Sequence, residues 1–198
     1  MSDGKSSLSF KMPYLKAPEV SVSDWLQGGS VKLSDLRGKY VLLHFFQQNC
    51  PGCFLSSLPI TEYIHKKYGG DKLEVIGISS RFEEYEVNTK KNTEDFLKSG
   101  KLTDHVIESI KGYGQEEKFL KKDGRYSIEI THRIGWDDGP SKAPSKTLSD
   151  YREDRFVTPY ECLIDDKGRI ILSDPHLSAD VTFHHLISKI TGIEVDFA

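Results

Sequence analysis

The sequence predicts an α/β fold in which helices cover both faces of a central mixed sheet. Residues 41–46 form a nearly continuous apolar run, which is typical of a central strand buried on both sides. Apolar residues then recur at helical spacing, at Phe54, Leu55, Leu58, Ile64 and Tyr68. A second buried strand over 73–79 completes a right-handed βαβ unit. With 198 residues, of which 37% are apolar, the chain can form one sizeable core.

The beginning of the chain is expected to be an extension followed by a hairpin. Residues 1–16 are mostly polar, and we place the folded domain, 17–198, behind them. The Gly28-Gly29 pair predicts the turn of an N-terminal hairpin, because it separates two short extended pieces.

The stretch between about 98 and 154 is interpreted as an insertion. It predicts short helices over 104–110 and 116–120, a half-buried strand over 126–134 and a loop over 136–146. Binding residues often lie on loops carried by a rigid scaffold, so the insertion could select substrates. A purely structural role fits the sequence equally well.

The remaining elements follow from local patterns. A helix around 93–97 is expected after the second buried strand, with Asn92 or Thr93 as its cap. The end of the chain predicts a strand over 156–165, an antiparallel partner at 170–172 and a closing amphipathic helix over 180–190.

The first apolar run leads into Cys50-Pro51-Gly52-Cys53, on the first turn of the predicted helix. Backbone N–H groups there have no intrahelical partner, and together with the helix dipole they favour a thiolate. Cys50 is therefore the candidate attacking sulfur, and Cys53 is placed to resolve a mixed disulfide. The alternatives are half of a zinc site, which lacks a second cysteine or histidine pair, and a structural disulfide, which a cytosolic chain disfavours.

These residues give the chain a resemblance to a known family. The apolar strand, the CPGC motif at a helix start and Thr158-Pro159 ahead of YECLID resemble the thioredoxin-like redoxins of the TlpA and AhpC/TSA group. Pro59 and the pairs Phe82-Glu83 and Asn88-Thr89 are similar to a branch of TlpA-like redoxins that carries CPGC. The resemblance covers about 17–190, apart from the insertion.

The resemblance implies a thioredoxin-like fold, with the insertion placed before the strand that carries a cis proline. It implies a cis peptide between Thr158 and Pro159, opposite the cysteine pair, where the backbone can pair with an extended substrate. Pro51 and Gly52 would line the same substrate groove. The function that we expect is thiol-disulfide oxidoreduction, in which disulfides are exchanged through the CPGC pair.

Two kinds of side chain are candidates for a supporting role. His44 lies six residues before Cys50, where the resembling family often has a buried acidic or amide side chain near the second cysteine. A neutral imidazole there could accept the proton of Cys53, and a core histidine with one hydrogen bond is the alternative. Glu83 or Glu86 could supply a carboxylate instead, unless that charged loop is simply solvated.

Two other functions are compatible with the sequence. One is a peroxiredoxin-type peroxidase. Peroxiredoxins carry Thr or Ser three residues before the reactive cysteine and Pro four residues before that, and here Gln47 and Leu43 occupy these positions. The other is a redox-sensing binding module in which CPGC is a switch.

Composition limits the partners. The net charge of −3, with both signs interspersed, gives no reason to expect binding to nucleic acid or to an anionic membrane. No segment approaches the length of a membrane span, so we expect a cytoplasmic protein, or an exported one if a leader has been removed.

Cys162 lies in an apolar strand, where it is expected to be a small buried hydrophobic residue. The histidines show no metal-ligand spacing, so we expect no metal and no cofactor beyond the redox-active cysteine pair. The expected partners are a protein or small-molecule disulfide and a dithiol electron donor. The sequence does not determine the oligomeric state.

Overall fold

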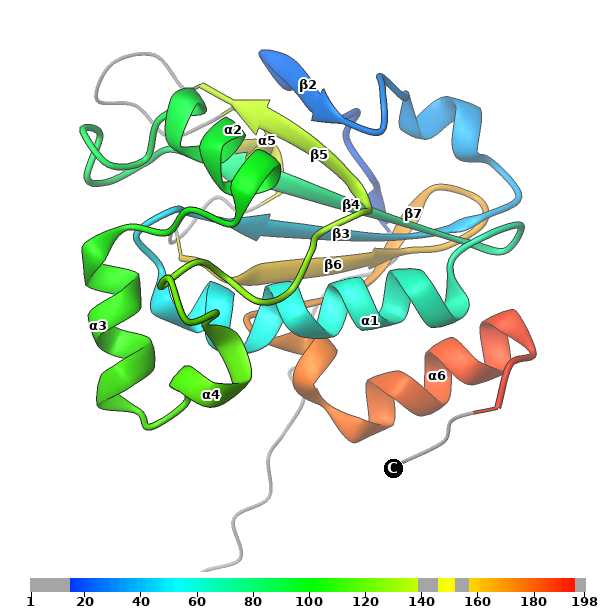
Figure 1. Ribbon diagram of the computed structural model, residues 1–198. Helices are drawn as coiled ribbons and strands as arrows, with labels where there is room; N and C mark the ends of the chain where they lie inside the picture. The colour runs from blue at the N-terminus through cyan, green and yellow to red at the C-terminus, as the bar shows by residue number, and fades with distance from the viewer. Residues whose placement is uncertain (1–14, 139–145, 152–156, 195–198) are drawn as a thin grey trace, which may run out of the picture.

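The computed structural model describes residues 15–138, 146–151 and 157–194 (Figure 1). The strands are β1 (Leu15–Lys16), β2 (Asp24–Gln27), β3 (Tyr40–Phe46), β4 (Leu73–Ser80), β5 (Arg133–Asp137), β6 (Tyr160–Ile164) and β7 (Arg169–Asp174). The α-helices are α1 (Leu58–Tyr68), α2 (Lys90–Ser99), α3 (Asp104–Gly112), α4 (Glu116–Phe119), α5 (Lys146–Tyr151) and α6 (Val181–Thr191). Short 3₁₀ helices, η1 (Leu33–Leu36) and η3 (Leu177–Ala179), and a π-helical turn, η2 (Cys53–Ser57), complete the described elements.

The described strands form one seven-stranded sheet in the order β1-β7-β6-β3-β4-β5-β2. β3 is parallel to β4 and β4 to β5, whereas the other neighbours are antiparallel. The sheet is therefore mixed, as predicted. β3 lies at its centre, and all its residues except Tyr40 are buried.

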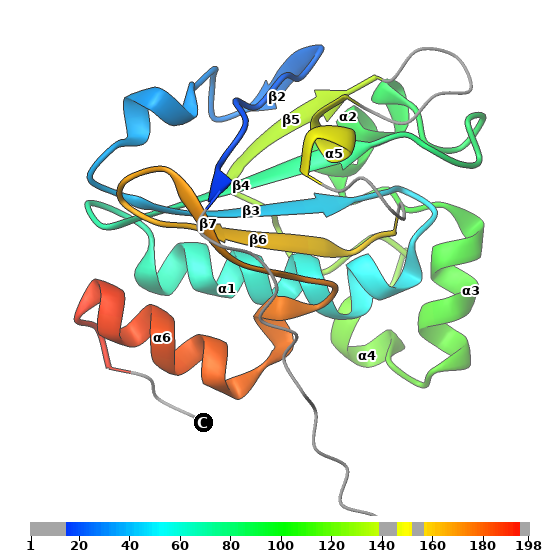
Figure 2. The ribbon, with the colours of Figure 1, turned by 180° about the vertical axis from the view of Figure 1, so that it is seen from behind.

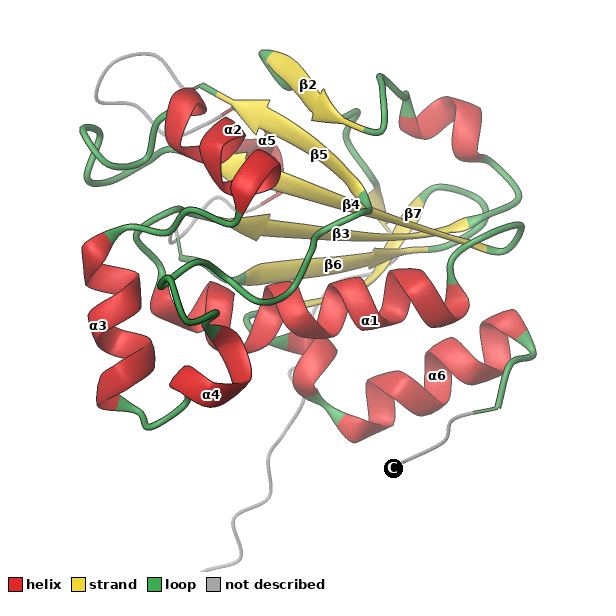
Figure 3. Cartoon of the chain, viewed as in Figure 1, coloured by secondary structure: helices red, strands yellow, loops and turns green. Residues whose placement is uncertain are grey.

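Helices cover both faces of this sheet. α1, α2 and α6 lie on one face (Figures 1 and 3), and α5 lies on the opposite face (Figure 2). Alternation along β3 directs Leu43 and Phe45 toward the α5 face and Leu42 and Phe46 toward the α1 face. His44 shares the α1 face by the same alternation. Among the described residues, no helix has the length and apolar character needed to cross a membrane.

The predicted N-terminal hairpin is wrong. β2 pairs with β5 at the far edge of the sheet, and the segment after Gly28-Gly29 leads into the 3₁₀ helix η1 rather than a strand. Long-range contacts explain the difference. The Arg133 guanidinium donates to the carbonyl oxygens of Gly28 and Gly29, and the Glu19 carboxylate accepts the N–H of Leu33 at 2.7 Å.

The other end of the sheet also gains a strand that the sequence did not predict. β1, at the end of the expected extension, pairs with β7 through Leu15 opposite Ile170. Residues 1–14 of that extension lie outside the described residues.

Two elements around the insertion lie elsewhere than predicted. α2 begins at Lys90 because the Thr89 hydroxyl accepts the N–H of Asn92, so the predicted cap at Asn92 or Thr93 is wrong. The strand predicted over 126–134 is also misplaced, since Tyr126 makes an isolated bridge to Leu120 and the sheet strand is β5. The first two residues of the predicted loop therefore belong to β5, and residues 139–145 lie outside the described residues.

The two short helices of the insertion, α3 and α4, are confirmed, and with the following segment they pack on the start of the CPGC helix. The Tyr126 ring lies 5.4 Å from that of Phe54, and its hydroxyl donates to the Phe54 carbonyl oxygen at 2.5 Å. Burial raises the pKa of the Tyr126 hydroxyl, so the hydroxyl stays a donor. Phe96 and Phe119 pack against the same Tyr126 ring. This part of the insertion therefore supports the helix that carries the cysteines.

Candidate active site

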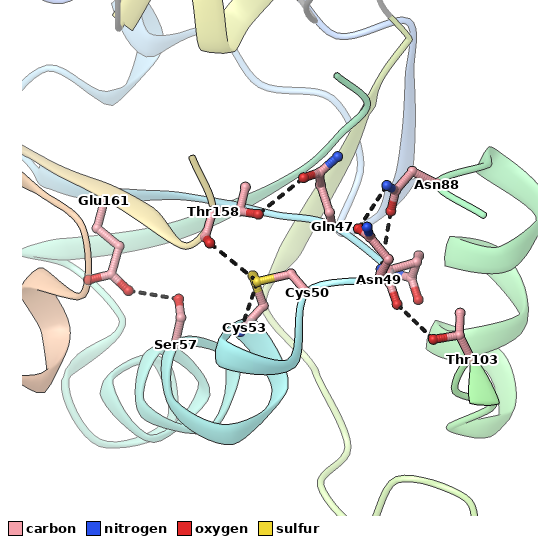
Figure 4. Close-up of a disulfide and its surroundings, with 10 residues drawn as sticks. Gln47, Asn49, Cys50, Cys53, Ser57, Asn88, Thr103, Thr158 and Glu161 are labelled. Carbon is pink, nitrogen blue, oxygen red and sulfur yellow. Dashed lines mark hydrogen bonds between the residues drawn. A yellow bond between two sulfur atoms is a disulfide. The ribbon is translucent and has the colours of Figure 1, made fainter. Parts of the chain in front are cut away.

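The cysteine pair lies where β3 gives way to a helix. After Phe46, three residues lead to Cys50, and helical backbone begins at Pro51. The sulfurs of Cys50 and Cys53 form a disulfide, and the Cys53 N–H points at Cys50 Sγ at 3.2 Å (Figure 4). Cys53 is fully buried, whereas Cys50 is partly exposed. This arrangement fits Cys50 as the sulfur that meets substrate, because it combines access with a backbone donor for its thiolate.

The helix turn after the cysteines is unusually wide. Cys53–Ser57 form the π-helical turn η2, which the sequence analysis did not predict. Pro59 supplies a physical reason, because it has no N–H to donate to the carbonyl of Leu55 and its ring crowds that carbonyl. Widening of the preceding turn relieves the conflict, and such turns often occur at functional sites.

Thr158 and Pro159 lie opposite the cysteines, as the resemblance implied. The peptide bond between them is cis, and the Thr158 carbonyl oxygen lies 3.4 Å from Cys50 Sγ. A side-chain carbon placed on Gly52 would lie 3.6 Å from Pro159 Cδ and 3.5 Å from Cε1 of the exposed His176. Pro159 and the exposed His176 therefore lie next to Gly52 of the CPGC motif. His176 was missed, since it follows β7 in a part of the sequence with no motif.

Buried amides hold the loop that precedes Cys50. The Thr158 hydroxyl donates to Gln47 Oε1 at 3.2 Å, and the Asn88 amide donates to Asn49 Oδ1 at 2.8 Å (Figure 4). The Asn49 N–H in turn donates to Asn88 Oδ1. Gln47 thus joins the cysteine loop directly to the cis-proline segment.

A buried carboxylate near the site comes from Glu161 and not from Glu83. Glu83 is exposed, and its backbone carbonyl rather than its carboxylate contacts the site by accepting from Asn88. Glu161 is fully buried on β6, where its Oε1 accepts from the Ser57 hydroxyl at 2.7 Å (Figure 4). The same oxygen accepts from the Ser178 hydroxyl, also at 2.7 Å. Burial raises the pKa of Glu161, although these hydrogen bonds oppose the shift. A carboxylate in the apolar strand YECLI was the signal that could have revealed it. Glu86 is likewise exposed.

His44 lies on β3 beneath the CPGC helix, fully buried. Its Nε2 is 2.8 Å from His132 Nε2, and His132 Nδ1 is 2.7 Å from Glu62 Oε2. Burial lowers the pKa of His44 well below its ordinary value, and the neighbouring His132 adds to the shift. His44 is therefore neutral at neutral pH. Sequence reasoning missed both partners.

Cys162 is buried in the sheet on the α5 face, away from the cysteine pair. Its burial agrees with the sequence interpretation of this cysteine as a small hydrophobic residue.

Comparisons with known proteins agree with this architecture. Residues 13–172 match the model of the AhpC/TSA family. The chain is similar to a thiol-disulfide isomerase from Corynebacterium glutamicum, with 25% identity, a TM-score of 0.64, and coverage of 90% of this chain and 98% of that one. No curated protein matches the chain at the sequence level.

Two further solved structures share the fold. A thioredoxin-like superfamily protein superposes with a TM-score of 0.66 at 23% identity, covering 91% of this chain and 99% of the other. The thioredoxin domain of a thiol-disulfide oxidoreductase from Bacteroides vulgatus gives a TM-score of 0.50 at 20% identity, covering 91% and 99%. The sheet order, the CPGC helix and the cis proline are thus parts of a thioredoxin-like fold, and the chain belongs to the AhpC/TSA family.

Proposed function

We propose that the protein is a thiol-disulfide oxidoreductase that works through Cys50 and Cys53. One observation carries the proposal: Cys50 is partly exposed and its sulfur lies 3.4 Å from the carbonyl oxygen of Thr158, next to cis Pro159, while Cys53 is buried. An exposed sulfur with a neighbouring thiol and an open backbone segment meets the requirements of disulfide exchange with an extended substrate.

The exchange proceeds in two steps. The Cys50 thiolate attacks one sulfur of a substrate disulfide, forming a mixed disulfide and releasing the other substrate sulfur as a thiolate that takes a proton from solvent. His44 takes the proton of Cys53, and the Cys53 thiolate then attacks Cys50 Sγ. The Cys50–Cys53 disulfide forms and the second substrate thiolate leaves, so the substrate gains two electrons and the cysteine pair loses them. A dithiol electron donor then reduces the Cys50–Cys53 disulfide back to two thiols.

The substrate groove is formed by Gly52, Pro159 and the backbone of 157–158. The absence of a side chain at Gly52 keeps the approach to Cys50 open. An extended substrate segment adds main-chain hydrogen bonds beside Thr158, in the manner of strand addition. The printed names of the similar structures, a thiol-disulfide isomerase and a thiol-disulfide oxidoreductase, support this assignment.

Peroxide reduction is the competing chemistry. It requires polar donors that stabilise the departing hydroxide, and the hydroxyl residue that peroxiredoxins place there is replaced by Gln47. The Gln47 oxygen accepts from Thr158, which ties this side chain to the substrate groove. Disulfide exchange should therefore be the faster reaction of Cys50.

The test compares second-order rate constants of the reduced protein with hydrogen peroxide and with a protein disulfide such as insulin. We expect exchange with the disulfide to be faster, and Cys50→Ser to abolish it. A peroxide rate that exceeds the disulfide rate by orders of magnitude would overturn the proposal in favour of a peroxidase.

A further inference from the structure

A surface groove lies between β7 and α6, on the face of the sheet that α1 and α6 cover. Its volume is about 430 Å³, within the range of about 300–1,000 Å³ that is typical of ligand pockets, so it has room for several side chains. The apolar residues that line this groove, which we call the α6 groove, are Ile171, Leu172, Leu177, Phe183 and Leu186. Exposed apolar surfaces of this kind usually mark a place that another segment or molecule covers.

The register of β1 directs the preceding part of the chain toward the α6 groove. Leu15 lies opposite Ile170 and Lys16 opposite Arg169, in antiparallel pairing. If this pairing is continued, the residue before Leu15 comes opposite Ile171 and the next one comes opposite position 172. Both of these β7 residues line the groove. The segment of this chain that is nearest to the groove is therefore the end of 1–14, which lies outside the described residues.

The sequence of this segment has the pattern of an extended chain with one apolar side. Residues 8–14 read LSFKMPY, and apolar residues stand at every second position: Leu8, Phe10, Met12 and Tyr14. Side chains alternate between the two faces along a strand. Leu15 lies opposite Ile170, which packs in the cluster on the α5 face, so the even-numbered positions before it are directed to the α6 face. The apolar side of the segment is thus the side of the groove.

Pro13 explains how the segment can leave the sheet edge toward α6. The Ala17 N–H donates to the Gly168 carbonyl oxygen at 2.9 Å, so in a regular ladder the N–H groups of residues 15 and 13 also face β7. Pro13 has no N–H to donate, so the ladder weakens at this position. The residue before a proline favours extended backbone, which keeps Met12 in the alternation.

We propose that residues 8–14 of this chain dock in the α6 groove, with the side chains of Phe10, Met12 and Tyr14 against its apolar wall. The docking goes beyond the exchange reaction and does not depend on it. It is a feature of this chain rather than of the family, because the AhpC/TSA match covers 13–172 and leaves out α6 and most of the segment.

The chain's own segment has an advantage over a separate protein as the occupant. β1 already holds Leu15 beside the groove, so docking of the preceding residues is an intramolecular event with a high effective concentration. The entropy cost is limited to ordering about seven residues, and the removal of apolar side chains from water offsets it. A second copy of the chain lacks the first of these advantages.

The first experiment uses methionine as a selective probe, because the chain contains two methionines, Met1 and Met12. In protein labelled with ¹³C at the methionine methyl groups, the Met12 methyl should show nuclear Overhauser effects to the ring of Phe183 or to the methyl groups of Leu186. Met1 lies outside the docked segment and should show none. Met12→Leu removes one signal and so assigns it. A Met12 signal without any such contact would overturn the proposal.

A mixture of labelled and unlabelled protein separates docking within one chain from exchange between two copies. An isotope-filtered spectrum of this mixture detects contacts between Met12 of a labelled copy and the groove of an unlabelled copy. Docking within one chain predicts that no such contact is seen. A contact between copies would show that the occupant is a second copy, and would overturn the proposal as stated.

The second experiment compares Phe10→Ser with Lys11→Ser in urea unfolding. Both variants change the same segment, but Phe10 belongs to its apolar side and Lys11 to the opposite side. We expect Phe10→Ser to lower the urea midpoint and to increase binding of a dye that is specific for exposed apolar surface. Lys11→Ser is the matched control and should change neither. Equal behaviour of the two variants would contradict the docking.

The third experiment asks whether Phe10 and the groove act together. Leu186 is half-buried in the wall of the groove, and Leu186→Ala removes part of that wall. Residues in contact show non-additive effects, so Phe10→Ser should lower the urea midpoint less in the Leu186→Ala background than in wild type. Additive effects would mean that Phe10 does not contact this groove.

Discussion

Glu161 of β6 and His44 of β3 lie directly opposite each other in the sheet, yet their side chains bind in opposite directions. Glu161 accepts hydrogen bonds from Ser57 and Ser178, on the side of η3, whereas His44 contacts His132, on the side of β5. Glu161 and His44 therefore belong to two separate hydrogen-bond networks under the CPGC helix. Each can be tested without disturbing the other.

Glu161→Gln should change how stability depends on pH. Burial raises the folded-state pKa of Glu161 above its ordinary 4.5, so between these two values the folded state holds a proton that the unfolded chain has released. The wild-type free energy of unfolding should fall there by about 1.4 kcal/mol per pH unit as pH rises, and level off above the folded-state pKa. The glutamine variant has no carboxyl group at this position, so its free energy of unfolding should not fall in this way.

Urea unfolding at a series of pH values checks this prediction. The variant should gain stability relative to wild type as pH increases from 4.5. A glutamine fits the site, since its oxygen can accept the Ser178 N–H and its amide can donate to the Ser57 and Ser178 hydroxyls. Identical pH dependence in the two proteins would mean that the pKa of Glu161 is not raised in the folded state.

Cys53→Ser should accumulate mixed disulfides, because Cys50 can still attack but nothing resolves the product. Cys50→Ser should trap almost none, since the two remaining cysteines, Cys53 and Cys162, are fully buried. Non-reducing gels after reaction with a protein disulfide distinguish the two variants. Equal trapping by both would contradict the assignment of the attacking sulfur.

Gly52→Ala should stabilise the fold and narrow the groove. Gly52 has helical backbone angles, φ −59° and ψ −32°, which alanine adopts freely, and the new methyl group would make ordinary contacts with Pro159 and His176. We expect the free energy of unfolding to rise by about 0.5–1 kcal/mol. Exchange with a protein disulfide should slow more than exchange with a small disulfide. Equal slowing of both would show that Gly52 does not border the substrate groove.

Tyr126→Phe should weaken the attachment of the insertion to the CPGC helix. The variant loses the hydrogen bond to the Phe54 carbonyl, and we expect a loss of about 1 kcal/mol in the free energy of unfolding. Tyr113, which is 70% exposed, offers a control, and Tyr113→Phe should have no measurable effect in urea unfolding. If Tyr126→Phe also left the free energy of unfolding unchanged, the hydrogen bond to Phe54 would contribute nothing to stability.

Local signals predicted the centre of the fold. The apolar run of β3, the cysteines at a helix start and the position of Thr158-Pro159 are each written in a few consecutive residues, and the structure places them together. The edges of the sheet could not be predicted in this way. The pairing of β2 with β5 depends on contacts between residues about 100 positions apart, such as Arg133 with Gly28 and Gly29.

The candidate site shows the same division. Cys50 and Cys53 are a motif, but His132 stands between Thr131 and Arg133 in a stretch whose period indicated a different strand, and Glu62 looks like one more charge on an amphipathic helix. Only the packing of α1 against the start of β5 brings these two residues to His44. Glu161 differs, because a carboxylate in an apolar strand is visible in the sequence.

Gly77 has no functional group, yet the contact between the two histidines depends on what it lacks. A methyl group there would collide with His44 Nε2 and with Ile134 Cδ1, each 2.6 Å away. The absence of a side chain at Gly77 of β4 thus leaves room for His44 of β3 to contact His132 on the other side of that strand. Relatives with a larger residue at this position should therefore have lost the histidine pair as well, so Gly77, His44 and His132 are expected to be inherited or discarded together.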